Sequence, residues 1–73
     1  MEELLEILTE ACPGIDFELE TALVDDGILE PLDIETIVSE IRDVFDVEIP
    51  AEDMTAENFN SAESIMELIE SYR

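Results

Sequence analysis

The stretch that decides the fold runs from residue 25 to residue 45 and reads DDGILEPLDIETIVSEIRDVF. Pro31 marks the start of a helix within it, because proline has no backbone N–H and the first helical position needs none. Beyond Pro31 the apolar residues recur with the 3.6-residue period of an amphipathic helix. The sequence therefore predicts a helix over 31–45. Its apolar side holds Ile34, Ile37, Val38, Ile41, Val44 and Phe45.

The opposite side of this helix is polar, with one exception. Leu32 is an apolar residue on the polar side, and its position indicates a contact surface. We expect a protein partner to bind this side of the helix and the residues that flank its start. The expected contact residues are Glu30, Leu32, Asp33, Glu35, Thr36, Ser39, Arg42 and Asp43.

Residues 2–12 and 61–72 show the same helical periodicity. Pro13 and Gly14 end the first of these helices. We expect Asn60 to cap the start of the second, with Glu63 completing a capping box. The expected buried stripes are Met1, Leu4, Leu5, Leu8 and Ala11 in the first helix and Ala62, Ile65, Met66, Ile69 and Tyr72 in the last.

Two irregular segments connect these helices. Residues 51–59 are expected to hold a short helical turn capped by Thr55. Residues 15–29 form a long loop, and a loop of this length in a small domain is often functional or packs by its own side chains. The sequence thus predicts an all-α fold of four helices, with a short third helix and a long first loop. The expected apolar anchors of the loop are Ile15, Phe17, Leu19, Leu23, Val24 and Ile28.

Composition limits the possible functions. The chain has 73 residues, one cysteine, no histidine and 47% apolar residues. A single domain over 1–73 is therefore predicted, with a core built by hydrophobic packing rather than by disulfides or a structural metal. Histidine is absent for acid–base work near neutral pH, and lysine is absent for Schiff-base or phosphate chemistry. An enzyme is not expected.

The charge is strongly negative. Acidic residues outnumber basic ones by 22 to 2, which gives a net charge of −20. Such a surface repels nucleic acid and anionic membranes and attracts basic protein surfaces or cations. No stretch reaches the roughly 18 apolar residues of a membrane span, and the N-terminus lacks the basic start of a signal peptide. We expect a cytoplasmic protein with a basic protein partner, no nucleic acid and no membrane insertion.

The sequence also bears on metal binding and on the reactivity of the single cysteine. An EF-hand loop needs acids at positions 1, 3 and 5 before its glycine, but counting back from Gly27 places Ala22 and Val24 at two of them. No dedicated metal site is expected. Cys12 is expected to be a small buried residue, its thiolate disfavoured by the negative end of the helix dipole. Weak contacts with divalent cations are expected only at Asp25, Asp26, Asp33 and Glu35.

Three segments resemble the acyl carrier protein family, which includes acyl, D-alanyl and peptidyl carriers. They are DDGILEPL at 25–32, FDVEIP at 45–50 and NFNS at 58–61, and the resemblance extends over nearly the whole chain. In that family an Asp-Ser-Leu triplet opens the second helix, and its serine carries 4′-phosphopantetheine. Here the triplet reads Glu30-Pro31-Leu32. The resemblance implies an acyl-carrier-like four-helix bundle.

The proline removes the hydroxyl on which the family's chemistry depends. No serine or threonine lies between Thr21 and Thr36, so a shifted alignment does not restore it. Ser39 is a poor substitute, because it lies more than two turns beyond the free N–H groups at the start of the helix. Outward positions that are commonly apolar in carriers are here Glu35 and Ser39. The 4′-phosphopantetheine cofactor is therefore predicted to be absent at Pro31.

Three functions remain open at this point. The first is a non-carrying, carrier-like protein that docks on or regulates a carrier-dependent synthase, ligase or transferase with a basic surface. The second is a working acyl, D-alanyl or peptidyl carrier with an unusual attachment. The third is an acidic mimic of nucleic acid that covers a basic protein surface.

Overall fold

Four α-helices and one 3-10 helix make up the structure, a computed structural model that describes residues 1–73. The elements are α1 (Glu2–Ala11), α2 (Pro31–Phe45), the 3-10 helix η1 (Ala51–Asp53), α3 (Ala56–Phe59) and α4 (Ala62–Ser71). The predicted all-α fold with a short third helix and a long first loop is confirmed. No helix is both long enough and apolar enough to cross a membrane.

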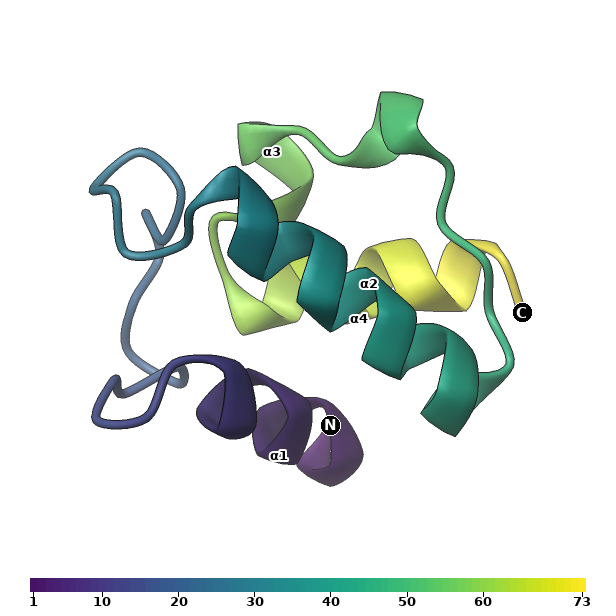
Figure 1. The fold of residues 1–73 in the computed structure, drawn as a ribbon, viewed down its shortest axis with the longest axis horizontal. Coiled ribbons are helices and arrows are strands. Elements are labelled where there is room, and N and C mark those ends of the chain that lie inside the picture. Colours follow the sequence, from purple (N-terminus) through teal and green to yellow (C-terminus); the bar gives the residue numbers. More distant parts are fainter.

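The helices pack as crossing pairs around one core. In Figure 1, α2 crosses in front of α4, α1 runs below both, and α3 lies above, next to the start of α4. Contacts join α1 with α2, α3 with α4, and α1 with α4. The long loop that joins α1 to α2 forms one side of the molecule, at the end where α2 begins.

Local signals explain where the helices begin and end. Pro31 takes the first position of α2 as predicted, and Asp46 ends α2 in the left-handed region at φ 57°. Asp46 donates its N–H to the carbonyl of Arg42 at 3.0 Å, which satisfies one of the free carbonyls at the helix end. Thr55 caps α3 by accepting the N–H of Asn58 at 3.4 Å, also as predicted.

The predicted cap of α4 is wrong. Ser61, not Asn60, is the N-cap, and its hydroxyl accepts the N–H of Ser64 at 3.1 Å. Asn60 instead binds the long loop. Its Oδ1 accepts the N–H groups of Val24 (3.0 Å) and Asp25 (3.1 Å), and its carbonyl accepts the N–H of Leu23 (2.8 Å). The loop is thereby fixed to the junction between α3 and α4.

The core is wholly apolar, and no polar or charged residue is buried. Most predicted core positions are confirmed. Met1, Val44 and Tyr72 are instead exposed, because they lie at or beyond helix ends, where periodicity no longer determines which side faces a neighbour. Leu19 is 76% exposed and does not anchor the loop. Leu29, which was not among the expected anchors, is buried and does. The buried residues are Leu4, Ile7, Leu8, Phe17, Leu23, Leu29, Ile34, Ile37, Ile41, Val47, Ile49, Phe59, Ala62, Ile65 and Ile69.

Candidate functional site

Pro31 lies exposed at the point where the long loop becomes α2. The preceding Glu30 is extended, with φ −97° and ψ 165°, and donates its backbone N–H to the Asp33 carboxylate at 3.1 Å. Asp33, in the first turn of α2, thus fixes the backbone of the residue that precedes the helix. A negative charge at this position also interacts favourably with the helix dipole. Pro31 itself supplies no hydroxyl.

The predicted partner-binding residues mostly lie on the surface of α2. All are exposed except Asp33, which is half-buried, and Leu32 is 72% exposed. The set is not one uniform face, however. Glu35 lies on the flank toward α3, whereas Thr36 lies on the flank toward α1. The Thr36 hydroxyl donates to the Leu32 carbonyl at 3.1 Å, so its hydrogen is already used within the helix.

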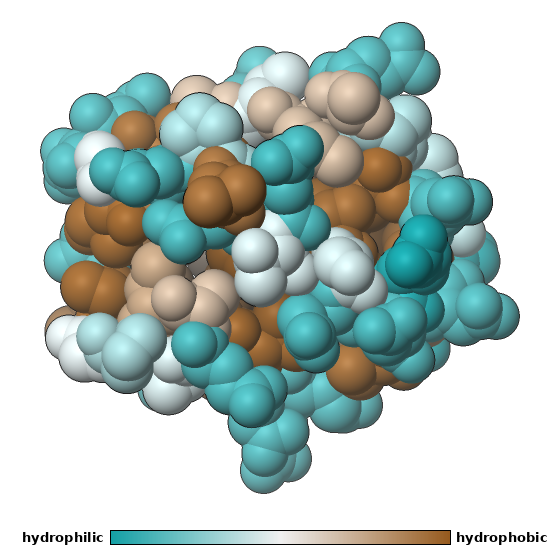
Figure 2. Space-filling model, in the orientation of Figure 1, coloured by the Kyte–Doolittle hydropathy of each residue, from teal (hydrophilic) through white to brown (hydrophobic).

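A hollow that the sequence did not predict lies beside Pro31. This Pro31 groove has a volume of about 370 Å³ and lies between the loop, the start of α2 and the segment that leads into α3. Glu35 is its only charged lining residue, so it suits apolar groups. Figure 2 shows hydrophobic residues reaching this side of the molecule in separate patches framed by hydrophilic ones. The groove is lined by Val24, Leu29, Pro31, Ile34, Glu35, Met54 and Ala56.

Met54 in the wall of the groove belongs to a segment that is tied to α3 and α4. The neighbouring Asp53 accepts a hydrogen bond from the Tyr72 hydroxyl through its carboxylate, and its carbonyl accepts from Asn58 Nδ2 at 2.9 Å. At the same end of the molecule the Arg73 guanidinium lies 5.9 Å from the centre of the Phe45 ring. The two hydrogen bonds to Asp53 hold the 51–55 segment in place.

We expect Tyr72 to titrate above its ordinary pKa of 10.0, mainly because its hydroxyl donates to Asp53, whose charge also opposes ionisation. Since the folded protein holds this proton more tightly, the contact stabilises the fold below the ordinary pKa and is lost as pH rises through the raised value. Tyr72 is the only tyrosine and there is no tryptophan, so the ultraviolet absorbance of tyrosinate reports it alone. Asp53→Asn should lower the pKa, and ionisation of the unaltered protein at the ordinary value would contradict the contact.

Cys12 lies near the start of α2. Its thiol donates to the Ile28 carbonyl at 4.0 Å, and it is half-buried. Burial raises the pKa of the Cys12 thiol, and the nearby carboxylates of Asp33 and Glu30 raise it further. Burial and charges that the fold brings close thus disfavour the thiolate, rather than the helix dipole expected from the sequence, and Cys12 is half-buried rather than buried.

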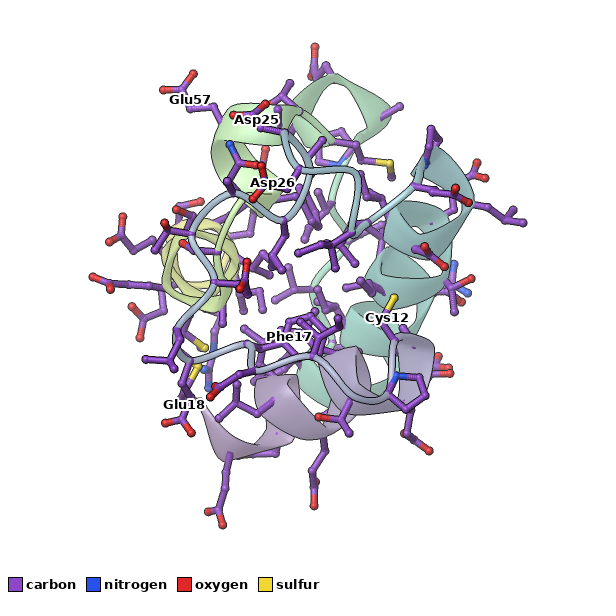
Figure 3. All side chains as sticks on the ribbon, turned by 90° about the vertical axis from the view of Figure 1, so that its left-hand side faces the viewer. Cys12, Phe17, Glu18, Asp25, Asp26 and Glu57 are labelled. Carbon is purple, nitrogen blue, oxygen red and sulfur yellow. The ribbon has the colours of Figure 1, made fainter.

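The carboxylates expected to contact divalent cations lie in two places. Asp25 and Asp26 lie on the loop beside α3, as Figure 3 shows, whereas Asp33 and Glu35 lie on α2. Asp25 Oδ2 accepts a hydrogen bond from Asn60 Nδ2 at 3.1 Å. No three histidine, cysteine, aspartate or glutamate side chains form a group that could hold a metal ion.

Comparison with known proteins finds no family model, no curated protein and no solved structure that matches this chain.

Proposed function

We propose that this chain is an acyl-carrier-like docking protein that carries no 4′-phosphopantetheine. The observation that supports this proposal is Pro31 at the first position of α2, where the triplet of a carrier would place its serine. The four-helix arrangement with a short third helix and a long first loop is compatible with it. The chain would act by binding a carrier-dependent enzyme through α2 rather than by transferring an acyl group.

The α2 surface supports a partner with a basic, partly apolar face. Leu32 offers an exposed apolar side chain between the carboxylates of Glu30 and Asp33 in sequence, and Glu35 follows within one turn. A basic enzyme surface would be attracted over a long range by the net charge of −20 and oriented by contacts at this helix. Leu32 would then supply the apolar anchor.

The test uses coenzyme A and a broad-specificity phosphopantetheinyl transferase, with intact mass as the readout. The natural protein is expected to stay unmodified, whereas Pro31→Ser, or Pro31→Ser with Glu30→Asp, should gain one phosphopantetheinyl group. A mass increase on the natural protein would show a working carrier. If both variants remain unmodified, the missing hydroxyl is not the only difference and the carrier-like assignment fails.

The same transferase tests docking. The natural protein should inhibit modification of a genuine carrier, because both present their second helix to the enzyme. Leu32→Ala is expected to weaken inhibition about 10-fold, the effect of losing roughly 1.4 kcal/mol of apolar contact. Leu19→Ala is the matched control, since Leu19 is equally apolar and 76% exposed but lies on the long loop. Equal effects of both variants would exclude α2 as the docking surface.

A further inference from the structure

A second groove lies away from the Pro31 groove, where three segments distant in sequence meet. These are the start of α1, the 17–21 part of the long loop and the start of α4, and the hollow between them has a volume of about 320 Å³. Its apolar floor includes Leu5, Phe17 and Ala62, and its charged rim consists of Glu18, Glu20 and Glu63. We call it the Phe17 groove.

The floor of the Phe17 groove is part of the protein core. Phe17 and Ala62 are 4% and 3% exposed, and Leu5 is half-buried. Figure 3 shows the Phe17 ring directed inward above α1, while Glu18 projects outward at the edge of the molecule. A group that enters the groove would therefore meet packed apolar side chains below and carboxylates at its sides.

The loop side of the rim is held by its own hydrogen bonds. The carbonyl of Asp16 accepts the N–H groups of Leu19 and Glu20, both at 3.1 Å, and the Asp16 carboxylate accepts the N–H of Glu18 at 3.2 Å. This turn fixes the backbone of two rim glutamates before any ligand binds. A rim that is already ordered loses little conformational entropy on binding.

The only positive group on the groove is the N-terminal ammonium of Met1, which also lines it. The only basic residues of the chain are Arg42 on α2 and Arg73 at the C-terminus, and neither lines the groove. Three carboxylates against one ammonium group leave the surroundings of the apolar floor negative, which opposes anionic ligands and favours cationic groups that also carry an apolar part. The Pro31 groove differs, because it has a single carboxylate.

We propose that the Phe17 groove binds a basic amphipathic peptide segment of a partner protein, with one apolar side chain in the hollow and lysine or arginine side chains on the rim glutamates. The volume is at the lower limit of small-molecule sites, which suits a single anchoring side chain. Binding here is independent of the α2 surface.

The test titrates the full chain with a synthetic helical peptide of leucine and lysine in amphipathic spacing, at about 0.15 M salt. Binding is measured by calorimetry, and backbone amide shifts in nuclear magnetic resonance locate it. Two comparison peptides replace every lysine by glutamate or every leucine by serine. The leucine–lysine peptide should bind with shifts at 17–21 and 61–63, and each comparison peptide should bind at least about 10-fold more weakly.

Two variants with equal charge change complete the experiment. Glu18→Gln/Glu20→Gln/Glu63→Gln neutralises the rim and should weaken binding about 10-fold, while Glu35→Gln/Glu40→Gln/Asp43→Asn neutralises exposed acids of α2 and should change it less than about 3-fold. Thermal unfolding checks that both variants fold. The proposal would be overturned if both variants weakened peptide binding equally, or if the peptide with serine in place of leucine bound as tightly as the leucine–lysine peptide. Amide shifts centred on α2 would overturn it as well.

Discussion

Raising the NaCl concentration from about 10 mM to about 1 M should stabilise this protein by several kcal/mol. The screening length falls over that range from ~30 Å to ~3 Å, while the folded molecule measures 27 × 24 × 19 Å. At the lower concentration nearly every acidic pair therefore repels across the whole fold. Two like charges about 10 Å apart cost about 0.4 kcal/mol in water, and a net charge of −20 provides many such pairs.

The measurement is the midpoint of thermal unfolding as a function of salt. For a domain of this size 1 kcal/mol corresponds to ~4–8 °C, so the expected rise is on the order of 10 °C or more. MgCl₂ at equal ionic strength should raise the midpoint further through loose contacts with carboxylates. A neutral osmolyte at equal osmolality is the control for general solvent effects. A midpoint that does not change with salt would show that the acids are too dispersed to oppose folding.

Asn60→Ala is expected to cost about 2 kcal/mol of unfolding free energy, a large part of a typical total of ~5–15 kcal/mol. The substitution leaves the N–H groups of Val24 and Asp25 without their acceptor and removes the donor to Asp25 Oδ2. Val24 is half-buried, so water replaces its lost hydrogen bond poorly. Chemical denaturation of the variant and the natural protein measures the difference.

An exchange of the two side chains provides the control. Asn60→Asp keeps an acceptor for both N–H groups but places its carboxylate against Asp25, and should also destabilise. Combining it with Asp25→Asn restores an amide opposite a carboxylate, so the double variant should recover most of the lost stability. If the stability losses of Asn60→Asp and Asp25→Asn simply add in the double variant, the contact between these side chains does not fix the loop.

The helices could be predicted because each carries its own periodic signal. α2 begins at Pro31 and ends at Phe45 as its pattern indicates, since proline and the apolar period act locally. The cap of α4 could not be predicted in the same way. Asparagine and serine are both good N-caps. What distinguishes Asn60 from Ser61 is that its side chain accepts the N–H of Val24, in a loop 36 positions away.

The candidate site could be predicted only where local signals determine it. The exposure of Leu32 follows from helical geometry, and the structure agrees. The Pro31 groove could not be foreseen, because Met54 meets Pro31 and Val24 only through the tertiary fold. Leu19 was expected in the core because it is apolar, yet the turn at Asp16 leaves it 76% exposed. A loop has no regular period from which the direction of a side chain can be deduced.

The attachment of the long loop to Asn60 also has a kinetic consequence. A contact between partners 36 positions apart requires closure of a large chain segment, whereas the turns of α2 form among near neighbours. The loop should therefore settle after the rate-limiting step, so that substitutions at Asn60 accelerate unfolding and leave the folding rate almost unchanged. Because Val24 and Leu29 line the Pro31 groove, partial opening of this late-forming segment would remove one wall of the groove while the four helices remain folded.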